Sequence, residues 1–373
     1  MSNSDVILRG ERFKLAFANE AVCGTDPGTS NYSNIFGVVQ SATLPDPVLD
    51  ISPIYALGTN SNRDFFTAYR GKMQVNGSIP DIWLLDGRML YLGIGNTILT
   101  TGADPYTHTI YETTALPTFS LHATQLDSNG DVALMRRWHG GKVGRMTLEA
   151  SEGDFLKAAI DDMQFVGLTN NQSGENFYSA AVADISPTYP TTEPYLFSYG
   201  SMTLNGSEFA RLKNFRLEIN NSLDAKYYIT DNGTARLPYE HREGKREYRF
   251  SCTVDIADST LYKELVRMGT YSSSFKGFQI VLQFTRGTND TITITMPKTT
   301  PSIGGDALGC LIRSAPHNIM DNPVVSVPLD ILVRNIGIVV VDSIARYPIT
   351  SRSFTFTPKV GSALTVASVE VNA

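Results

Sequence analysis

The residues of this chain best suited to chemistry lie in one stretch, Arg136-Arg-Trp-His-Gly-Gly-Lys142. Two adjacent glycines between a histidine and a lysine could let backbone N–H groups approach a phosphate. The stretch lacks the GxxxxGK[ST] spacing of a nucleotide-binding loop, and no helix is expected after it to supply an N-terminal dipole. We therefore interpret it as the glycine-bearing turn of a β-hairpin.

Other reactive residue types do not form a recognisable site. The pair Gly93-x-Gly95 lacks the third glycine of a dinucleotide loop, and adjacent Asp161 and Asp162 would point to opposite faces of a strand. No Gly-x-Ser-x-Gly motif is present. The histidines and cysteines show no metal-ligand spacing: His108, His122, His139, His241, His317, Cys23, Cys252 and Cys310. We expect no catalytic residue, no cofactor and no metal, and hence a protein that is not an enzyme.

Composition narrows the choice of partners. Charged residues make up 18% of the 373 residues, and the formal net charge is −6. A negative chain is poorly suited to gripping nucleic-acid phosphates. A surface this poor in charge favours burial against protein partners. No apolar run reaches the length of about 18 residues that a membrane span needs, so no membrane contact is expected.

The chain contains a long internal repeat, which determines the expected architecture. Seven residues lie 179 positions before a matching or similar one: Phe36, Val38, Leu44, Ala56, Tyr69, Arg70 and Val75, matched by Phe215, Leu217, Leu223, Ala235, Tyr248, Arg249 and Val254. Leu85 and Gly93 continue the match at a spacing of 176, with Leu261 and Gly269. Two copies of this size predict two domains of ordinary length.

Periodicity predicts similar elements in both copies. In the first, alternation predicts strands at 35–40, 65–76, 118–125, 132–138, 142–150 and 155–168. Apolar residues at 82, 85, 89 and 92 predict a helix over 82–92, with Asp81 as its N-cap. In the second, strands are expected at 195–204, 212–220, 247–256, 278–284, 291–296 and 324–334, with a helix over 258–268. Further strand-like pieces occur at 353–358 and 364–371.

The order of these elements predicts a mainly β protein. We expect two tandem antiparallel β-sandwich or barrel domains, each with one flanking α-helix. The expected divisions are an irregular N-terminal arm (1–33), a first domain (34–168), a linker (169–193), a second domain (194–335) and a C-terminal β extension (336–373).

The second copy resembles the tail tube, or major tail, proteins of long-tailed bacteriophages. The resemblance rests on Met202-Thr-Leu-Asn-Gly206, on Phe215 to Leu223, on the strand 248–256 with the helix after it, and on Pro328 to Val333. In the first copy, 139–148, 153–156 and 165–167 are similar to a strand pair of that family, and 20–25 resembles its N-terminal segment. The similarity covers most of residues 15–335 and stops before the C-terminal extension.

The resemblance implies a structural virion protein, the major subunit of the tail tube. Its subunits would polymerise as stacked rings around a channel for DNA, in a virion tail whose proteins are made in the host cytoplasm. Six domains form a ring in single-domain relatives, so the duplication predicts a pseudo-sixfold ring of three chains. The implied partners are other copies of this chain, the tail terminator, tape measure and tail tip proteins, and double-stranded DNA that passes without specific binding.

The same resemblance points to the long loops and the N-terminal arm as contacts between rings. The candidate residues for these inter-ring contacts are Tyr55, Asn62, Arg63, Asp64, Arg236, Tyr239, His241, Arg242 and Lys245. Two alternatives stay open: a tail terminator or baseplate ring protein of the same fold, and a β-rich adhesive module.

Overall fold

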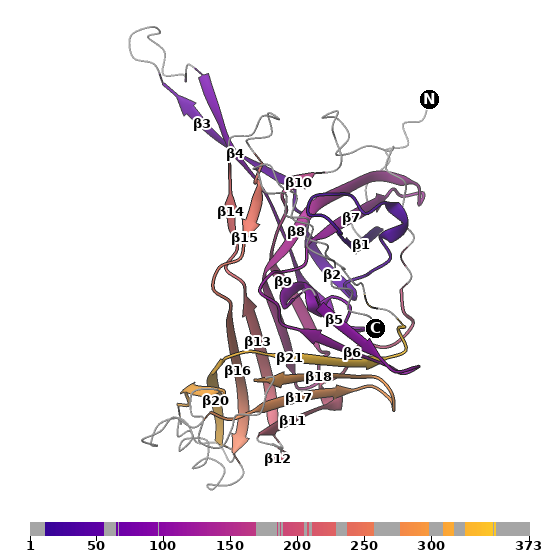
Figure 1. Ribbon diagram of the computed structural model, residues 1–373, viewed down its shortest axis with the longest axis vertical. Helices are drawn as coiled ribbons and strands as arrows, with labels where there is room; N and C mark the ends of the chain where they lie inside the picture. Colours follow the sequence, from indigo (N-terminus) through magenta and orange to yellow (C-terminus); the bar gives the residue numbers. More distant parts are fainter. Residues whose placement is uncertain are drawn as a thin grey trace, which may run out of the picture.

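A computed structural model of the chain describes residues 12–55, 65, 67–95, 97–168, 185, 187, 189–204, 207–208, 211–228, 237–256, 277–297, 309–316, 325–345 and 347. Within them the protein is mainly β and antiparallel, as predicted (Figure 1). The predicted helix over 258–268 and the strand-like pieces at 353–358 and 364–371 lie outside the described residues.

The larger sheet contains strands from both halves of the chain. Its main path runs β2-β4-β9-β8-β13-β16-β20-β19, with every neighbouring pair antiparallel. The strands in that order are β2 (Val38–Thr43), β4 (Thr67–Trp83), β9 (Lys157–Gln164), β8 (Val132–Ser151), β13 (Leu212–Asn220), β16 (Glu247–Ile256), β20 (Val325–Val333) and β19 (Leu311–Ser314).

This path contains one strand arrangement twice. The four strands of the first half follow the spatial order first, second, fourth, third along the chain (β2, β4, β9, β8), and those of the second half do the same (β13, β16, β20, β19). The two sets join where β8 pairs with β13. The internal repeat is therefore also a repeat of topology, although the boundaries of the predicted domains stay a prediction.

The spacing of 179 residues that defines the predicted repeat is not kept in the register of the paired strands. Val38 pairs with Trp83, whereas Leu217, which lies 179 residues later, pairs with Phe250 rather than with residue 262. Tyr69 is exposed on a hairpin, whereas its match Tyr248 is buried. The reason is that β4 is 17 residues long and β16 only 10, so the two copies use different parts of the equivalent strand.

Four further strands extend the larger sheet. β1 (Phe13–Asn19) pairs with β7 (Phe119–Leu126), and β7 pairs with the first half of β8. β3 (Pro47–Ile54) pairs with β4, and β10 (Gly167–Leu168) pairs with β8. Part of the predicted irregular arm is thus a strand, because Leu15 to Ala18 are buried against β7 and the loops around it.

The smaller sheet packs on one face of the larger one. Its order is β12 (Ser207–Glu208), β11 (Gly200–Leu204), β17 (Ile280–Thr285), β18 (Thr291–Met296), β21 (Gly337–Asp342), β6 (Tyr106–Tyr111) and β5 (Thr97–Thr101). In Figure 1 its strands cross those of the larger sheet at a steep angle. β21 lies between β18 of the second half and β6 of the first, so the C-terminal extension joins the two halves.

One hydrophobic cluster fills the space between the sheets and includes residues from both halves. Alternate residues of the main-path strands point into it, as Phe215, Leu217 and Ile219 do on β13. Phe215 contacts Phe284 of the smaller sheet at a ring-centroid distance of 5.7 Å. The strict alternation explains why β13, β16 and β18 occupy the predicted residues without any shift.

The predicted helix over 82–92 is wrong. Ile82 and Trp83 end β4, with Asp81 inside that strand, and only Leu90–Gly93 form a single 3₁₀ turn, η2. Leu84, Met89, Leu90, Tyr91 and Leu92 are all fully buried. The apolar spacing therefore reflects a connection that crosses the core, in which every face is buried rather than one helical face.

The predicted hairpin turn at His139 to Lys142 is also wrong, because β8 continues through these residues without reversing direction. Residues up to Gly141 pair with β7, and residues from Lys142 pair with β9. Gly140 has φ +64°, and a Cβ there would lie 2.1 Å from Val166. The two glycines form a corner at which one long strand leaves one sheet arm for the other.

Three short elements complete the described chain. Two are 3₁₀ turns, η1 (Thr29–Asn31) and η4 (Phe197–Tyr199), and the third is a small hairpin of β14 (Asp224–Lys226) and β15 (Glu240–Arg242).

Candidate assembly surfaces

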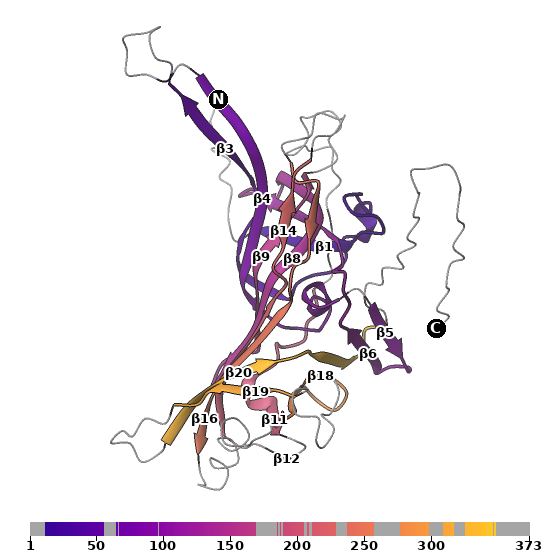
Figure 2. The ribbon, with the colours of Figure 1, turned by 60° about the vertical axis from the view of Figure 1, so that its left-hand side comes forward.

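A long hairpin of β3 and β4 stands clear of the rest of the molecule (Figures 1 and 2). Its register runs from Pro47 opposite Val75 to Ile54 opposite Thr67. No strand was predicted between residues 40 and 65, a stretch that contains Pro47 and Pro53. Both prolines sit on an edge strand, where a missing N–H costs little.

Large apolar side chains are exposed along this hairpin and near its tip. Val48, Ile51 and Tyr69 are 67%, 57% and 64% exposed. Ile54, Tyr55 and Phe65 are exposed as well. A hairpin that exposes this many large apolar side chains is typical of a surface that another protein covers.

The shorter β14–β15 hairpin emerges at the same end of the sheet and contacts the longer one. Tyr227 donates a hydrogen bond to the carbonyl oxygen of Met73 (3.3 Å), and the Lys72 ammonium lies 4.7 Å from the Tyr227 ring centroid. Tyr228 and Tyr239 pack edge to face at 5.4 Å. In both halves, therefore, the connection between the first and second strands of the repeat projects from this end.

The predicted contact residues divide into three groups. Tyr55, Tyr239, Arg242 and Lys245 are exposed on or beside the two hairpins. His241 is 3% exposed, so its side chain is not available at the surface. The others, Asn62, Arg63, Asp64 and Arg236, lie outside the described residues. The exposed apolar residues of β3, Val48, Ile51 and Ile54, were missed, because they lie three residues apart and do not alternate with polar residues.

Inside the chain, β8 and β13 form a junction between the two halves. Seven residue pairs are in register, from Ser151 opposite Asn214 to Arg145 opposite Asn220. Glu149 and Arg216, directly opposite one another, form an ion pair at 3.1 Å. Beside the junction, buried Asn221 donates hydrogen bonds to the carbonyl oxygens of Gly93 and Val143, both at 3.0 Å.

The main path ends in two edges that carry no further strand among the described residues. β2 forms one edge and β19 the other, so they occupy the positions of β13 and β8 in the repeat. From Gln40 to Thr43, β2 is exposed. Within the part of the chain that the structure describes, each edge presents unpaired backbone groups of the kind that β8 and β13 satisfy in each other.

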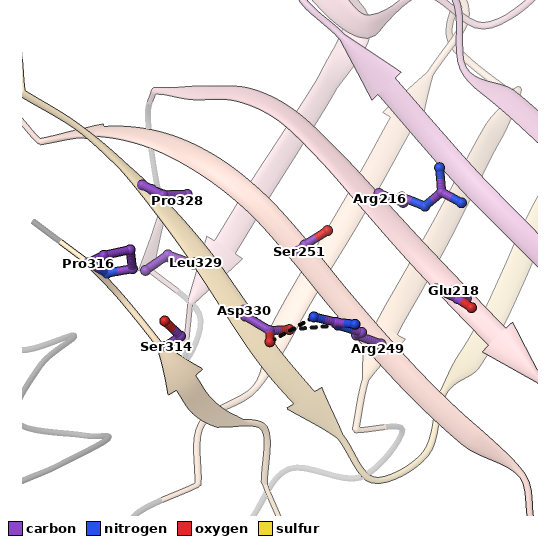
Figure 3. Close-up of a pocket in the computed structure, with 9 residues that line it drawn as sticks. All are labelled: Arg216, Glu218, Arg249, Ser251, Ser314, Pro316, Pro328, Leu329 and Asp330. Carbon is purple, nitrogen blue, oxygen red and sulfur yellow. Dashed lines mark hydrogen bonds and ion pairs between the residues drawn. The ribbon is translucent and has the colours of Figure 1, made fainter. Parts of the chain in front are cut away.

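The face of the larger sheet that points away from the core carries alternating charges. Near the β19 edge, Arg249 of β16 donates two hydrogen bonds to Asp330 of β20, both at 3.0 Å (Figure 3). Arg216 and Glu218 project from β13 on the same face. A shallow hollow there is lined by these charged residues together with Pro316, Pro328 and Leu329.

Other cations on this face are also paired with acids. Arg145 lies 3.5 Å from Asp161, Lys213 lies 3.0 Å from Asp255, and Lys157 lies 2.7 Å from Asp154. The hydrogen bond from Lys157 lowers the pKa of Asp154 below its ordinary value. With each cation beside an acid, this part of the face carries little net charge.

The stretch with the most chemical character, Arg136 to Lys142, has a structural role. Glu20 is fully buried and accepts hydrogen bonds from Ser120 Oγ (2.5 Å) and Gly140 N (2.7 Å). His139 Nδ1 lies 2.8 Å from the same serine oxygen. Because the serine proton goes to Glu20, His139 donates to Ser120, the reverse of a histidine that activates a serine nucleophile.

Burial changes the pKa values within this network. It raises the pKa of Glu20 and lowers that of His139 to about 4. Arg137, in the same stretch, forms an ion pair with Asp26 at 2.7 Å and holds the segment before η1 against β8. The described residues contain no group of three or more His, Cys, Asp or Glu side chains arranged to hold a metal. Nor does any helix among them have the length and apolarity of a membrane span.

Comparison with known proteins places the chain in a family. Residues 10–310 match the sequence model of a family described as phage tail tube protein. Because the match covers most of the chain, the protein belongs to the phage tail tube protein family. No curated protein matches the chain.

Proposed function

We propose that this chain is the repeating subunit of a phage tail tube, and that its chains close into rings by pairing β19 of one copy with β2 of the next. The observation that carries the proposal is the β8–β13 junction. There, the third strand of one copy of the repeat pairs with the first strand of the next copy. β19 is the third strand of the second copy, and β2 is the first strand of the first copy. Pairing β19 of one chain with β2 of the next therefore repeats the β8–β13 contact between two chains.

Three chains in this arrangement give a closed barrel. Eight main-path strands per chain make 3 × 8 = 24 strands. At about 4.8 Å per strand, the barrel measures roughly 37 Å between backbones if the strands are untilted, and roughly 50 Å at a tilt of about 40°. Such a channel is wider than a DNA duplex. Closure also removes both exposed edges.

The charged face of the larger sheet lines this channel, because the core and the smaller sheet cover the other face. Its cations are neutralised by acids such as Asp330 and Glu149, so double-stranded DNA passes without being held. The protein is a structural component of the virion tail and not an enzyme. Its partners are other copies of itself and the tail terminator, tape measure and tail tip proteins.

Successive rings stack through the β3–β4 and β14–β15 hairpins. The exposed apolar side chains of the longer hairpin supply the buried area, and Tyr55, Tyr239, Arg242 and Lys245 lie on or beside the same projections. Burial of such side chains contributes about 25 cal/mol per Å² of apolar surface.

The mass of the ring tests the stoichiometry. A ring of three chains has a mass of 3 × 40.9 = 122.7 kDa. Native mass spectrometry of isolated rings, with negative-stain images of the assembled protein, should give this mass and a pseudo-sixfold outline with a central hole. A ring of six whole chains would overturn the proposal.

Paired substitutions test stacking separately from ring closure. Ile54→Asp with Tyr69→Asp should leave rings of normal mass that no longer form tubes, because charge replaces the apolar surface between rings. Tyr199→Asp is the matched control, since Tyr199 is 50% exposed in η4, outside both hairpins and the N-terminal arm. Tubes of normal length from the double variant would disprove the role of the hairpin.

A further inference from the structure

The segment that joins β1 to β2 is held against the larger sheet by polar contacts. We call this segment, residues 20–34, the strap. At its start, the buried carboxylate of Glu20 accepts a hydrogen bond from the backbone N–H of Gly140 of β8 at 2.7 Å. In its middle, Asp26 accepts a hydrogen bond from Arg137 of β8, also at 2.7 Å. Both contacts are made by acids of the strap, so its attachment depends on charge.

The far end of the strap is held by aromatic contacts. Tyr32 is buried, and the guanidinium carbon of Arg137 lies 4.7 Å from the centroid of its ring. The ring of His122 on β7 packs against Tyr32 edge to face, with 5.4 Å between the centroids. Tyr32 also belongs to a small apolar cluster with Ala16 and Ala18 of β1, which is separate from the main core. This cluster stays covered only while the strap is in place.

The hydrogen bonds around His122 hold this histidine in its neutral form. Arg137 Nε donates to His122 Nδ1 at 2.8 Å, and a guanidinium has no acceptor, so Nδ1 carries no proton. The proton is therefore on Nε2, which donates to Thr124 Oγ1 at 2.9 Å. The His122 side chain is fully buried. A second proton on its ring would break the bond to Arg137 and bury two cations side by side.

A second buried histidine, His139, is suited to the neutral form for a related reason. Its Nδ1 donates to Ser120 Oγ at 2.8 Å, and its Nε2 has no hydrogen-bond partner among the described residues. A proton on Nε2 would therefore be buried without an acceptor, which is costly. Glu20 lies 4.0 Å from Nδ1, the nitrogen that already carries a proton.

The charged and titratable groups around the two rings come from the strap and from β8. They are Glu20, Asp26 and Tyr32 on the strap and Arg137 on β8. Asp26 is already paired with Arg137. Burial raises the pKa values of Glu20 and Tyr32, and it lowers that of His139 to about 4 despite the attraction of Asp26. Opening of the strap would bring water to both rings and let Arg137 turn away from them.

We propose that the strap is an acid-sensitive device: when His122 and His139 gain protons, residues 20–34 leave β7 and β8 while both sheets stay folded. The closed strap fits the neutral rings and the open strap exposes them to water, so a fall in pH shifts the population towards the open form. Opening exposes Tyr32 and the small apolar cluster on β1, a surface that is covered at neutral pH. This behaviour belongs to a single chain and does not rest on the proposed function.

Hydrogen exchange along the strap tests the proposal. The full chain is studied at a concentration where it sediments as a monomer, and deuterium uptake by peptides from residues 20–34 is followed by mass spectrometry at pH 7.5 and pH 5. Each rate is divided by the rate for an unstructured peptide at the same pH. This ratio should rise about tenfold or more at pH 5, because the open strap binds protons that the closed one excludes. The ratio for β13 should not change.

Substitution of the two histidines tests their role. The double variant His122→Gln with His139→Gln should lose the rise, because glutamine keeps a donor and an acceptor but cannot gain a proton. Each single variant should lose part of it. His108→Gln is the matched control, since His108 is a fully buried histidine of the smaller sheet, and it should keep the rise.

An equal ratio at both pH values in the natural sequence would overturn the proposal, and this result needs no variant. A rise shared by the strap and β13 would also overturn it, because the whole chain would then open. A rise that persists in the double variant would assign the response to other groups. All of these outcomes are measured on the single chain, so failure here leaves the proposed function untouched.

Discussion

The first and third strands of the repeat each occur in two situations. As β13 and β8 they pair with each other inside the chain, and as β2 and β19 they form the free edges of the larger sheet. Inside the chain, seven pairs are in register, with Phe215, Leu217 and Ile219 buried and Arg216 ion-paired with Glu149. At the ends of the path, the same positions of the repeat carry no partner among the described residues. The difference teaches that a repeated strand arrangement satisfies one of its edge positions inside the chain and leaves the other two at the ends of the path. In the ring proposed above, β19 and β2 of neighbouring chains make that contact.

The largest expected difference between the junction and the edges comes from proline. Leu217→Pro at the junction removes a ladder hydrogen bond and a fully buried side chain, which should cost more than about 3 kcal/mol and unfold the chain. Gln40→Pro, at an irregularity of β2 between two paired residues, should leave the unfolding midpoint in urea within error. The same edge variant should abolish rings in native mass spectrometry. Rings from Gln40→Pro would show that β2 is not the paired edge.

A smaller effect is expected from the polar link beside the junction. Asn221→Ala leaves the carbonyl oxygens of Gly93 and Val143 without their donor, and it removes the acceptor of Arg246 Nε. Unpaired buried groups of this kind cost about 1–3 kcal/mol, so the free energy of unfolding should fall by about 3 kcal/mol. Chemical denaturation measures this loss. A change below about 0.5 kcal/mol would mean that the two halves hold together by their core alone.

The glycine corner of β8 predicts a dependence on pH. The folded pKa of His139, about 4, is lower than its ordinary 6.5. Between these values the unfolded chain binds the proton and the folded chain does not, so stability falls as the pH drops from 6.5 towards 4. At pH 5 the loss from this group is about 2 kcal/mol relative to pH 7. Glu20, whose pKa is raised, acts in the opposite direction and reduces the net slope.

His139→Gln removes the histidine contribution to this pH dependence. The difference in urea midpoint between pH 7.5 and pH 5 should therefore be smaller in the variant than in the natural sequence. An identical difference in both proteins would contradict the assignment.

The smallest effect is expected from the ion pair across the junction. Glu149 and Arg216 are each about half exposed, and pairs of this kind contribute about 0.2–1 kcal/mol. A double-mutant cycle with Glu149→Gln and Arg216→Gln should give a coupling energy in that range, decreasing with added salt. A coupling of more than about 2 kcal/mol would imply that this ion pair determines the register of the junction. We expect the backbone hydrogen bonds between β8 and β13 to determine it instead.

The sequence by itself determined the mainly β class, the duplication and many of the strands. Alternation along β13 and β16 was enough, because each of these strands has one face in the core and one face outside it. Between Leu84 and Ile94 the apolar side chains are buried on every side of the chain, so no alternation is present. Their spacing there resembles that of a helix by coincidence. A single strand that bends at Gly140 and Gly141 gave the same local signal as a hairpin.

Only the tertiary structure decided which strands share a sheet and which edges stay open. The pairing of β8 with β13, of β21 with β6, and the burial of His241 all depend on contacts between residues far apart in the chain. Periodicity reports which face of a strand is buried, but it carries no information about the neighbour on either side. The exposed hairpin of β3 and β4 and the free edges β2 and β19 therefore became visible only once the strands were placed in space.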